Sequence, residues 1–137
     1  MGQARIVAID YGRARVGLAV SDPLSIFAQP TGAYPPKQAL VQLEQIAEDD
    51  GIDLIVLGWP YELDGTEGES VETVKAFEKR LRVTLPGVKI VRWDERFTSK
   101  EAERAVIASG AKRKKRREKG IVDSVAAAIL LQSYLDQ

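Results

Sequence analysis

Residues 4–21 read ARIVAIDYGRARVGLAVS, and this stretch decides the fold. Residues 4–9 are almost all apolar and rich in β-branched side chains, which is typical of a strand buried on both faces. The strand is predicted to end at Asp10, and residues 11–14 are predicted to turn the chain. Residues 15–21 alternate larger apolar side chains with small or polar ones, so they form the second predicted strand.

A third, irregular strand is predicted over Ile26–Tyr34, because Pro30 and Gly32 interrupt it. The links between these three strands are short. Antiparallel strands can be joined by such turns, whereas parallel strands need a long crossover. The first quarter of the chain is therefore predicted to be an antiparallel meander.

The rest of the chain alternates helical and strand patterns. The predicted elements are a helix that follows Pro35-Pro36 and runs to Asp49, a buried strand over 53–58, a loop over 59–69, a helix with Val71, Val74, Phe77, Glu78 and Leu81 on one face, a strand over 88–93, a helix from Thr98 to about Ser109, and a final helix over 121–135. The order is βββαβαβα followed by α. This order predicts an α/β fold.

The composition restricts the chemistry. With 137 residues, 45% of them hydrophobic, the chain is predicted to be a single domain over residues 1–137. The chain has no histidine and no cysteine, which excludes imidazole bases, thiol nucleophiles and thiolate zinc sites. No secretory signal or run of transmembrane length is visible, so a cytoplasmic protein without a membrane partner is expected.

Three carboxylates, Asp10, Glu95 and Asp123, each lie where an apolar element meets a polar turn. Each also has an ordinary explanation. Asp10 has the setting of an Asx-type turn, Glu95 that of a solvated loop acid paired with Arg96, and Asp123 that of an acid at a helix N-terminus. Strand alternation puts Asp94 and Glu95 on opposite sides, but it does not choose between them where the strand ends.

Convergence of the three acids would call for a counterion. Carboxylates about 4 Å apart repel by roughly 1 kcal/mol in water and about 4 kcal/mol at an effective dielectric constant near 20. Oxygen ligands alone favour Mg²⁺ or Mn²⁺. One or two such ions activate water and stabilise the leaving oxygen of a phosphodiester. The acids therefore indicate a metal-dependent phosphodiester site.

A basic segment precedes the last helix. Residues 112–119 hold seven basic residues and one acidic residue, whereas the rest of the chain holds 13 basic and 19 acidic residues. Such a segment is either a solvated charge block or a binding site for a polyanion. The candidate residues for nucleic-acid binding are Lys112, Arg113, Lys114, Lys115, Arg116 and Arg117.

Two further features lie near the predicted strand ends. Trp59, Tyr61 and Trp93 have the rings needed for base stacking, although large aromatics at strand ends are more often core residues. Asp64-Gly65 and Gly68 mark a flexible loop beside the strand end at Gly58. Such a loop is placed to contact a substrate.

Four stretches together resemble the YqgF family, also called RuvX, of Holliday junction resolvases and pre-16S rRNA nucleases. They are Ile9-Asp10-Tyr11-Gly12 with Gly17, Gly58-Trp59-Pro60 with Asp64-Gly65, residues 94–99 (DERFTS), and residues 119–127 (KGIVDSVAA). The resemblance implies a ribonuclease-H-like fold, with a mixed five-stranded sheet in which three antiparallel strands precede two parallel ones. It places the acidic triad of the family on Asp10, Glu95 and Asp123, and so favours Glu95 over Asp94.

The leading interpretation is a metal-dependent nuclease that processes the 5′ end of precursor 16S ribosomal RNA. Its partner is then a nucleic acid, with RNA favoured and structured DNA possible. Holliday junction resolution requires the same chemistry and a homodimer, whereas RNA processing is open to a monomer. Two other classes stay open. One is a non-catalytic RNA-binding module. The other is a nucleotide-binding ATPase of the sugar-kinase and actin type, although those proteins resemble two such domains that enclose a nucleotide and this chain has one.

Overall fold

The computed structural model describes residues 4–98, 100–109 and 119–137, with side chains except at 97, 109 and 119–123. Its strands are β1 (Arg5–Tyr11), β2 (Val16–Ser21), β3 (Ala28–Tyr34), β4 (Ile52–Trp59) and β5 (Lys89–Asp94). Its helices are α1 (Pro36–Asp49), α2 (Ser70–Thr84), the 3₁₀ turn η1 (Glu95–Phe97), α3 (Lys100–Ser109) and α5 (Lys119–Leu135). None of the helices within these ranges is long and apolar enough to cross a membrane.

The five strands form one mixed sheet in the order β3-β2-β1-β4-β5. The pairs β1–β2 and β2–β3 are antiparallel, and the pairs β1–β4 and β4–β5 are parallel. This arrangement confirms the predicted meander followed by parallel strands. The irregularity predicted for β3 is a bulge, in which Leu18 pairs with Gly32 and Ala19 with Pro30, while the Thr31 hydroxyl donates to the Leu18 carbonyl at 3.0 Å.

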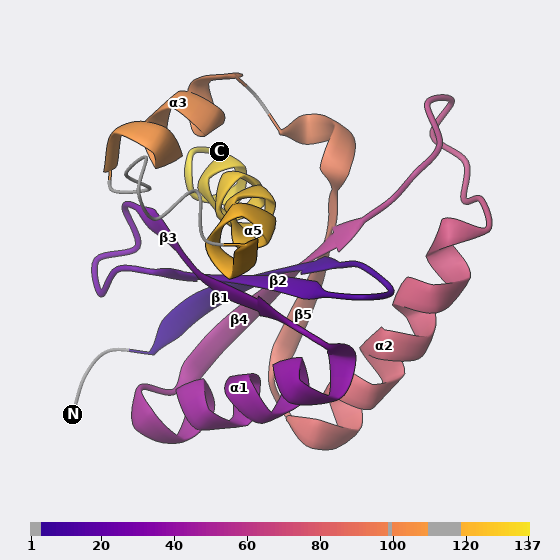
Figure 1. The fold of residues 1–137 in the computed structure, drawn as a ribbon, viewed down its shortest axis with the longest axis horizontal. Coiled ribbons are helices and arrows are strands. Elements are labelled where there is room, and N and C mark those ends of the chain that lie inside the picture. The colour runs from indigo at the N-terminus through magenta and orange to yellow at the C-terminus, as the bar shows by residue number, and fades with distance from the viewer. Residues whose placement is uncertain (1–3, 99, 110–118) are drawn as a thin grey trace.

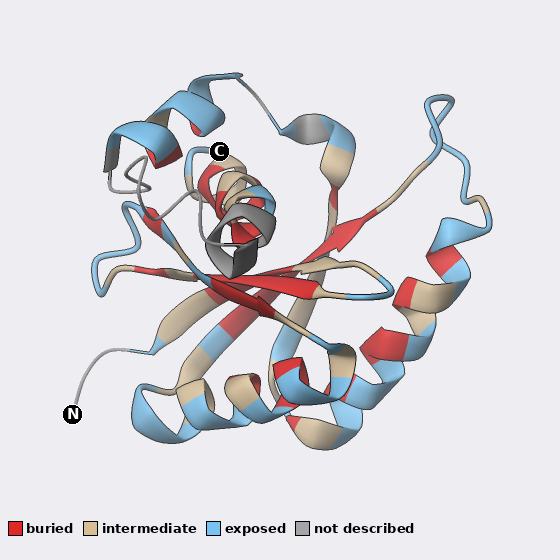
Figure 2. Ribbon diagram, viewed as in Figure 1, coloured by how far each residue is buried: buried red, intermediate tan, exposed pale blue. Residues whose placement is uncertain are grey.

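The helices cover the two faces of the sheet unequally. Helices α1 and α2 lie on one face, and α5 lies on the other with α3 packed outside it (Figure 1). Successive strand residues point to opposite faces, so Val7 and Ile9 join the α1/α2 core while Ala8 joins the α5 core. Figure 2 shows the resulting buried band along the sheet.

Small side chains let α5 approach the sheet closely. Ala127 and Ala128 of α5 are fully buried against Ala8 and Ala19 of the sheet. The buried amide of Gln132 fixes the helix further, because it accepts from the Ala28 backbone N–H and donates to the Ile26 carbonyl, both at 3.0 Å. Helix α5 is thereby held across β3, β2 and β1.

Trp59 is a core residue and has no exposed ring face for a base. It is fully buried, its indole N–H donates to Glu67 at 2.8 Å, and the Arg92 guanidinium carbon lies 4.0 Å from the ring centroid. Arg92 in turn donates two hydrogen bonds, of 3.0 and 2.8 Å, to the buried carboxylate of Glu78 on α2. This chain of contacts ties the end of β4 to α2 and β5.

Candidate active site

Asp10 lies in β1 and Glu95 begins η1 directly after β5, and β4 lies between these two strands in the sheet. Ile9 is opposite Leu57 in the parallel β1–β4 pair, so Asp10 and Gly58 are the next positions along. Neighbouring strands are about 4.8 Å apart, which puts β1 and β5 almost 10 Å apart. The two acids therefore meet only if their side chains reach over β4.

Gly58 leaves the space in which they meet. A Cβ at this position would lie 2.8 Å from Glu95 Oε1 and 3.2 Å from Leu130 Cδ2 of α5. The Glu95 carboxyl therefore occupies the volume above Gly58, beneath α5. Gly17 is opposite Asp10 on β2, so glycines flank Asp10 on both neighbouring strands. No other residue fits at position 58 without displacing Glu95.

The carboxyl groups of Asp10 and Glu95 hydrogen-bond to each other. Burial, followed by the charge of Asp10, raises the pKa of Glu95 to about 7. Burial also raises the pKa of Asp10, although its hydrogen bond to Glu95 opposes the rise. The pair is therefore expected to hold one shared proton up to about neutral pH. The Asx-turn interpretation of Asp10 is wrong, because this residue lies within β1 and its carboxyl group contacts Glu95.

Asp94 has a different role from Glu95. Its buried carboxylate accepts from the Arg96 backbone N–H at 2.9 Å and forms an ion pair with the Arg96 guanidinium at 2.6 Å. Hydrogen bonding to Arg96 lowers the pKa of Asp94. Arg96 therefore pairs with Asp94, and the predicted alternative in which Glu95 is a loop acid paired with Arg96 is wrong.

Two hollows adjoin the carboxyl pair. One of about 300 Å³ is lined by Asp10, Glu95, Thr98, Ala126, Ile129 and Leu130, and so lies between the pair and α5. A second of about 440 Å³ extends toward the start of α2 and is lined by Asp10, Tyr11, Arg13, Pro60, Glu69, Ser70, Thr73, Val74 and Glu95. Both carboxyl groups are thus accessible from two sides.

The other predicted site residues are not placed. The backbone of Asp123 belongs to α5, but its side chain lies outside the described residues, as do residues 112–117. Among the acidic side chains that are described, no group of three is arranged to hold a metal ion. Two of the three predicted acids are thus brought together, and the position of the third stays a prediction.

Residues 4–137 match the family model described as RuvX, Holliday junction resolvase. The chain belongs to the RuvX family. A RuvX relative from Salinibacter ruber, named "Putative pre-16S rRNA nuclease", is 45% identical over 135 residues, covering 98% of this chain and 94% of that protein. A protein of the same name from Chlorobaculum tepidum is 42% identical over 132 residues, covering 96% and 93%.

Two solved structures share the RuvX fold of this chain. Thermus thermophilus RuvC has a TM-score of 0.60 at 14% identity, covering 96% of this chain and 95% of that one. The same organism's RuvC in complex with a Holliday junction substrate has a TM-score of 0.57 at 12% identity, covering 98% and 96%. At such identities the likeness concerns the fold alone, and it confirms the predicted ribonuclease-H-like sheet.

Three residues near the acids were not predicted as part of the site. Gly58 belongs to one of the RuvX-like stretches, but only the structure shows that the Glu95 carboxyl lies over it. Thr98 lines the hollow beside α5 and donates to the Glu95 carbonyl at 3.0 Å. Arg13, in the turn after β1, lines the second hollow. Among the described residues that line this hollow, it is the one with a basic side chain.

Replacing Gly58 with alanine should separate the two carboxyl groups while the sheet still forms, because the added methyl group overlaps Glu95. We expect the pKa of Glu95, followed by ¹³C NMR of its carboxyl carbon, to fall from about 7 toward its ordinary value. Gly87→Ala is the control, since a Cβ there meets nothing within 4 Å and its positive φ makes it a test of backbone strain alone. An unchanged Glu95 titration in folded Gly58→Ala protein would show that position 58 does not hold the pair together.

The stability of the metal-free protein should fall as pH rises. A carboxyl whose pKa is raised by folding stabilises the protein below its unfolded pKa, and that contribution is lost as pH rises through the folded pKa, here about 7. When the pH is raised from 5 to 8.5, the Tm of the wild type should fall by several degrees more than the Tm of Glu95→Gln. The conversion used is about 2–4 °C of Tm for each kcal/mol of stability. Exposed Glu44→Gln is the matched control and should follow the wild type. Parallel curves for wild type and Glu95→Gln would contradict the raised pKa.

Proposed function

We propose that this chain is a divalent-metal-dependent nuclease whose substrate is the 5′ end of precursor 16S ribosomal RNA. Membership of the RuvX family and the names of its relatives make it a hydrolase of phosphodiester bonds. The metal, the site residues and the RNA substrate belong to the proposal. The observation that carries it is the hydrogen-bonded pair of Asp10 and Glu95 above Gly58.

The carboxyl pair has the chemistry of a hard-cation site. Two carboxyl groups that share a proton become two anionic oxygen ligands once that proton leaves, and both border an open hollow. Ligand sets of oxygen alone favour Mg²⁺ or Mn²⁺ over softer metals. When bound, such a cation supplies the positive charge that activates water and stabilises the leaving oxygen of a phosphodiester.

Asp123 is the proposed third ligand. Ala126 and Leu130 line the hollow beside the pair, and they lie three and seven residues after position 123 in the same helix. Positions with that spacing share one face of an α-helix. This spacing supports a triad made by β1, the residue after β5 and α5.

Basic residues would hold the phosphate backbone on either side of the cut. Arg13 borders the hollow near the start of α2, where it is placed to pair with a phosphate beside the scissile one. Residues 112–117 supply the strongest positive charge in the sequence, and they end two positions before the start of α5. We propose that they bind the backbone without reading bases, and that the protein works in the cytoplasm.

The test compares three substrates at one salt concentration with Mg²⁺ or Mn²⁺: a 5′-extended 16S RNA fragment, generic single-stranded RNA and a four-way DNA junction. The wild type should cut the 16S fragment, and Asp10→Asn should lower the rate by at least about 100-fold by removing a metal ligand. Asp53→Asn, which changes an exposed aspartate in β4, should cut normally.

Each other outcome has a definite meaning. Preferred cutting of the junction by a dimer would favour resolvase activity over RNA processing. RNA binding without cleavage under any metal would identify a binding module, and full activity in Asp10→Asn would exclude the proposed site.

A further inference from the structure

The position of the Glu95 carboxyl depends on the backbone that carries it. A glutamate side chain has three rotatable bonds, and holding it in one conformation costs entropy that its surroundings have to offset. Glu95 is the first residue of η1, a 3₁₀ turn of three residues. A turn this short makes few hydrogen bonds of its own. The contacts that fix Glu95 therefore come from the residues around it.

Asp94 holds the N-terminal side of this turn. It is the N-cap of η1, and its carboxylate accepts from the Arg96 backbone N–H at 2.9 Å. An aspartate in this place satisfies a backbone N–H that the start of the turn leaves unpaired. Asp94 and Arg96 flank Glu95 in the sequence, so this bond closes a short ring that includes the Glu95 backbone.

The Arg96 guanidinium fixes the Asp94 carboxylate in turn. Its Nε lies 3.0 Å from both carboxylate oxygens, and its Nη2 donates to Oδ2 at 2.6 Å. Such two-pronged pairing sets the angle of a carboxylate as well as its distance. On the other side, Nη1 donates at 3.2 Å to the carbonyl of Leu63, in the loop of residues 60–69, the β4–α2 loop. The cap is therefore anchored to a second part of the chain.

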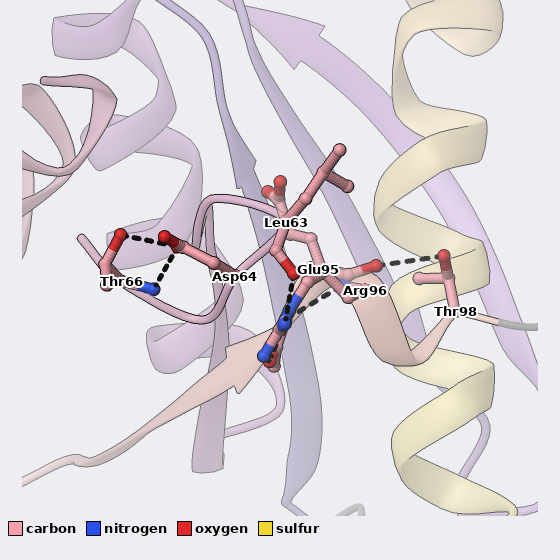
Figure 3. Close-up of polar contacts among 7 residues, drawn as sticks. Leu63, Asp64, Thr66, Glu95, Arg96 and Thr98 are labelled. Atoms are coloured by element: carbon pink, nitrogen blue, oxygen red, sulfur yellow. Dashed lines mark hydrogen bonds and ion pairs between the residues drawn. The ribbon is translucent and has the colours of Figure 1, made fainter. Parts of the chain in front are cut away.

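Thr98 holds the C-terminal side of the turn. Its backbone N–H and its hydroxyl both donate to the Glu95 carbonyl, at 3.3 and 3.0 Å. Figure 3 shows the hydroxyl bond on one side of Glu95 and the Arg96 guanidinium, bonded to Leu63, on the other. The Glu95 backbone is thus fastened from both sides, while its carboxyl takes no part in these bonds and lies over Gly58.

Asp94 also acts through its charge. This charge is one of the causes that raise the pKa of Glu95, after burial and the effects of Asp10. It would also attract a cation bound nearby, although the ion pair with Arg96 offsets much of it. Any neutral residue at position 94 removes this charge. A comparison of two neutral residues, one that caps the turn and one that does not, therefore isolates the geometric effect.

We propose that Asp94 is a positioning residue: its carboxylate, held by Arg96, fixes the backbone of Glu95. The Glu95 carboxyl then stays over Gly58, beside Asp10. The proposal rests on the nuclease function above, in which Glu95 is a metal ligand. Residues that orient a metal ligand typically change metal affinity or activity by about 10–100-fold when they are replaced. Asp94 acts through Glu95 in this way.

Two variants provide the test. Asp94→Ala removes the cap, whereas Asp94→Asn removes the same charge and keeps an oxygen that caps the turn. In the metal-free protein, NMR three-bond couplings about χ1 of Glu95 should report one rotamer in the wild type and in Asp94→Asn, and averaged rotamers in Asp94→Ala. Calorimetric titration with Mn²⁺ should give a Kd at least about tenfold weaker in Asp94→Ala, with a smaller loss in Asp94→Asn.

Both variants are expected to fold. The Arg96 side chain is 38% exposed, so its guanidinium stays hydrated when its partner is removed, and the loss of one cap is a small part of the stability of a domain. Asp53→Ala is the matched control, because it makes the same change at an exposed residue near the start of β4, at the other end of that strand from Gly58. It should keep both the Glu95 couplings and the Mn²⁺ affinity.

The outcomes separate this proposal from the nuclease function. A single Glu95 rotamer and an unchanged Mn²⁺ Kd in Asp94→Ala would overturn the positioning role while the nuclease function stands. Equal losses in Asp94→Ala and Asp94→Asn would assign the effect to charge and would also overturn it. If the wild type binds no Mn²⁺ and cuts no RNA, but the couplings follow the expected pattern, the nuclease function fails while the positioning of Glu95 by Asp94 stands.

Discussion

The site depends on one steric constraint, the missing side chain at Gly58. The sheet places β4 between the two strands that bring Asp10 and Glu95, and strand spacing alone would keep these acids apart. Because Gly58 has no Cβ, the Glu95 carboxyl lies over the middle strand and reaches Asp10. Helix α5 closes the space from above through Leu130, so the position of α5 and the state of the carboxyl pair are linked.

The consecutive acids Asp94, at the end of β5, and Glu95, directly after it, have different roles. Asp94 pairs with Arg96, whose guanidinium also holds the β4–α2 loop through the Leu63 carbonyl. Glu95 is left to meet Asp10 in a half-buried place, where the pair is expected to keep a proton that carboxyl groups in water would lose. The same short segment thus anchors a loop through one side chain and supplies half of an acidic pair through the next.

Sequence patterns predicted the parts of this account that depend on local chemistry. The apolar run of residues 4–9, the alternation in residues 15–21 and the short turns were sufficient for the meander, and the apolar face from Val71 to Leu81 was sufficient for α2. Register between parallel strands is set by tertiary packing, so no local pattern showed that Gly58 lies between the two acids. The choice of Glu95 over Asp94 came from the family resemblance, since alternation is lost where a strand ends. The triad and the basic segment remain predictions at Asp123 and residues 112–117.

If the shared proton of Asp10 and Glu95 marks a cation site, the binding of a metal ion releases that proton, and a measurement of proton release is the most direct test. Calorimetric titration of Mn²⁺ in buffers of different ionisation enthalpy counts the protons released per ion bound. With the pKa of Glu95 near 7, the count should approach one at pH 6 and fall toward zero at pH 8.5. Binding that releases no proton at pH 6, or that persists unchanged in Asp10→Asn, would contradict the account.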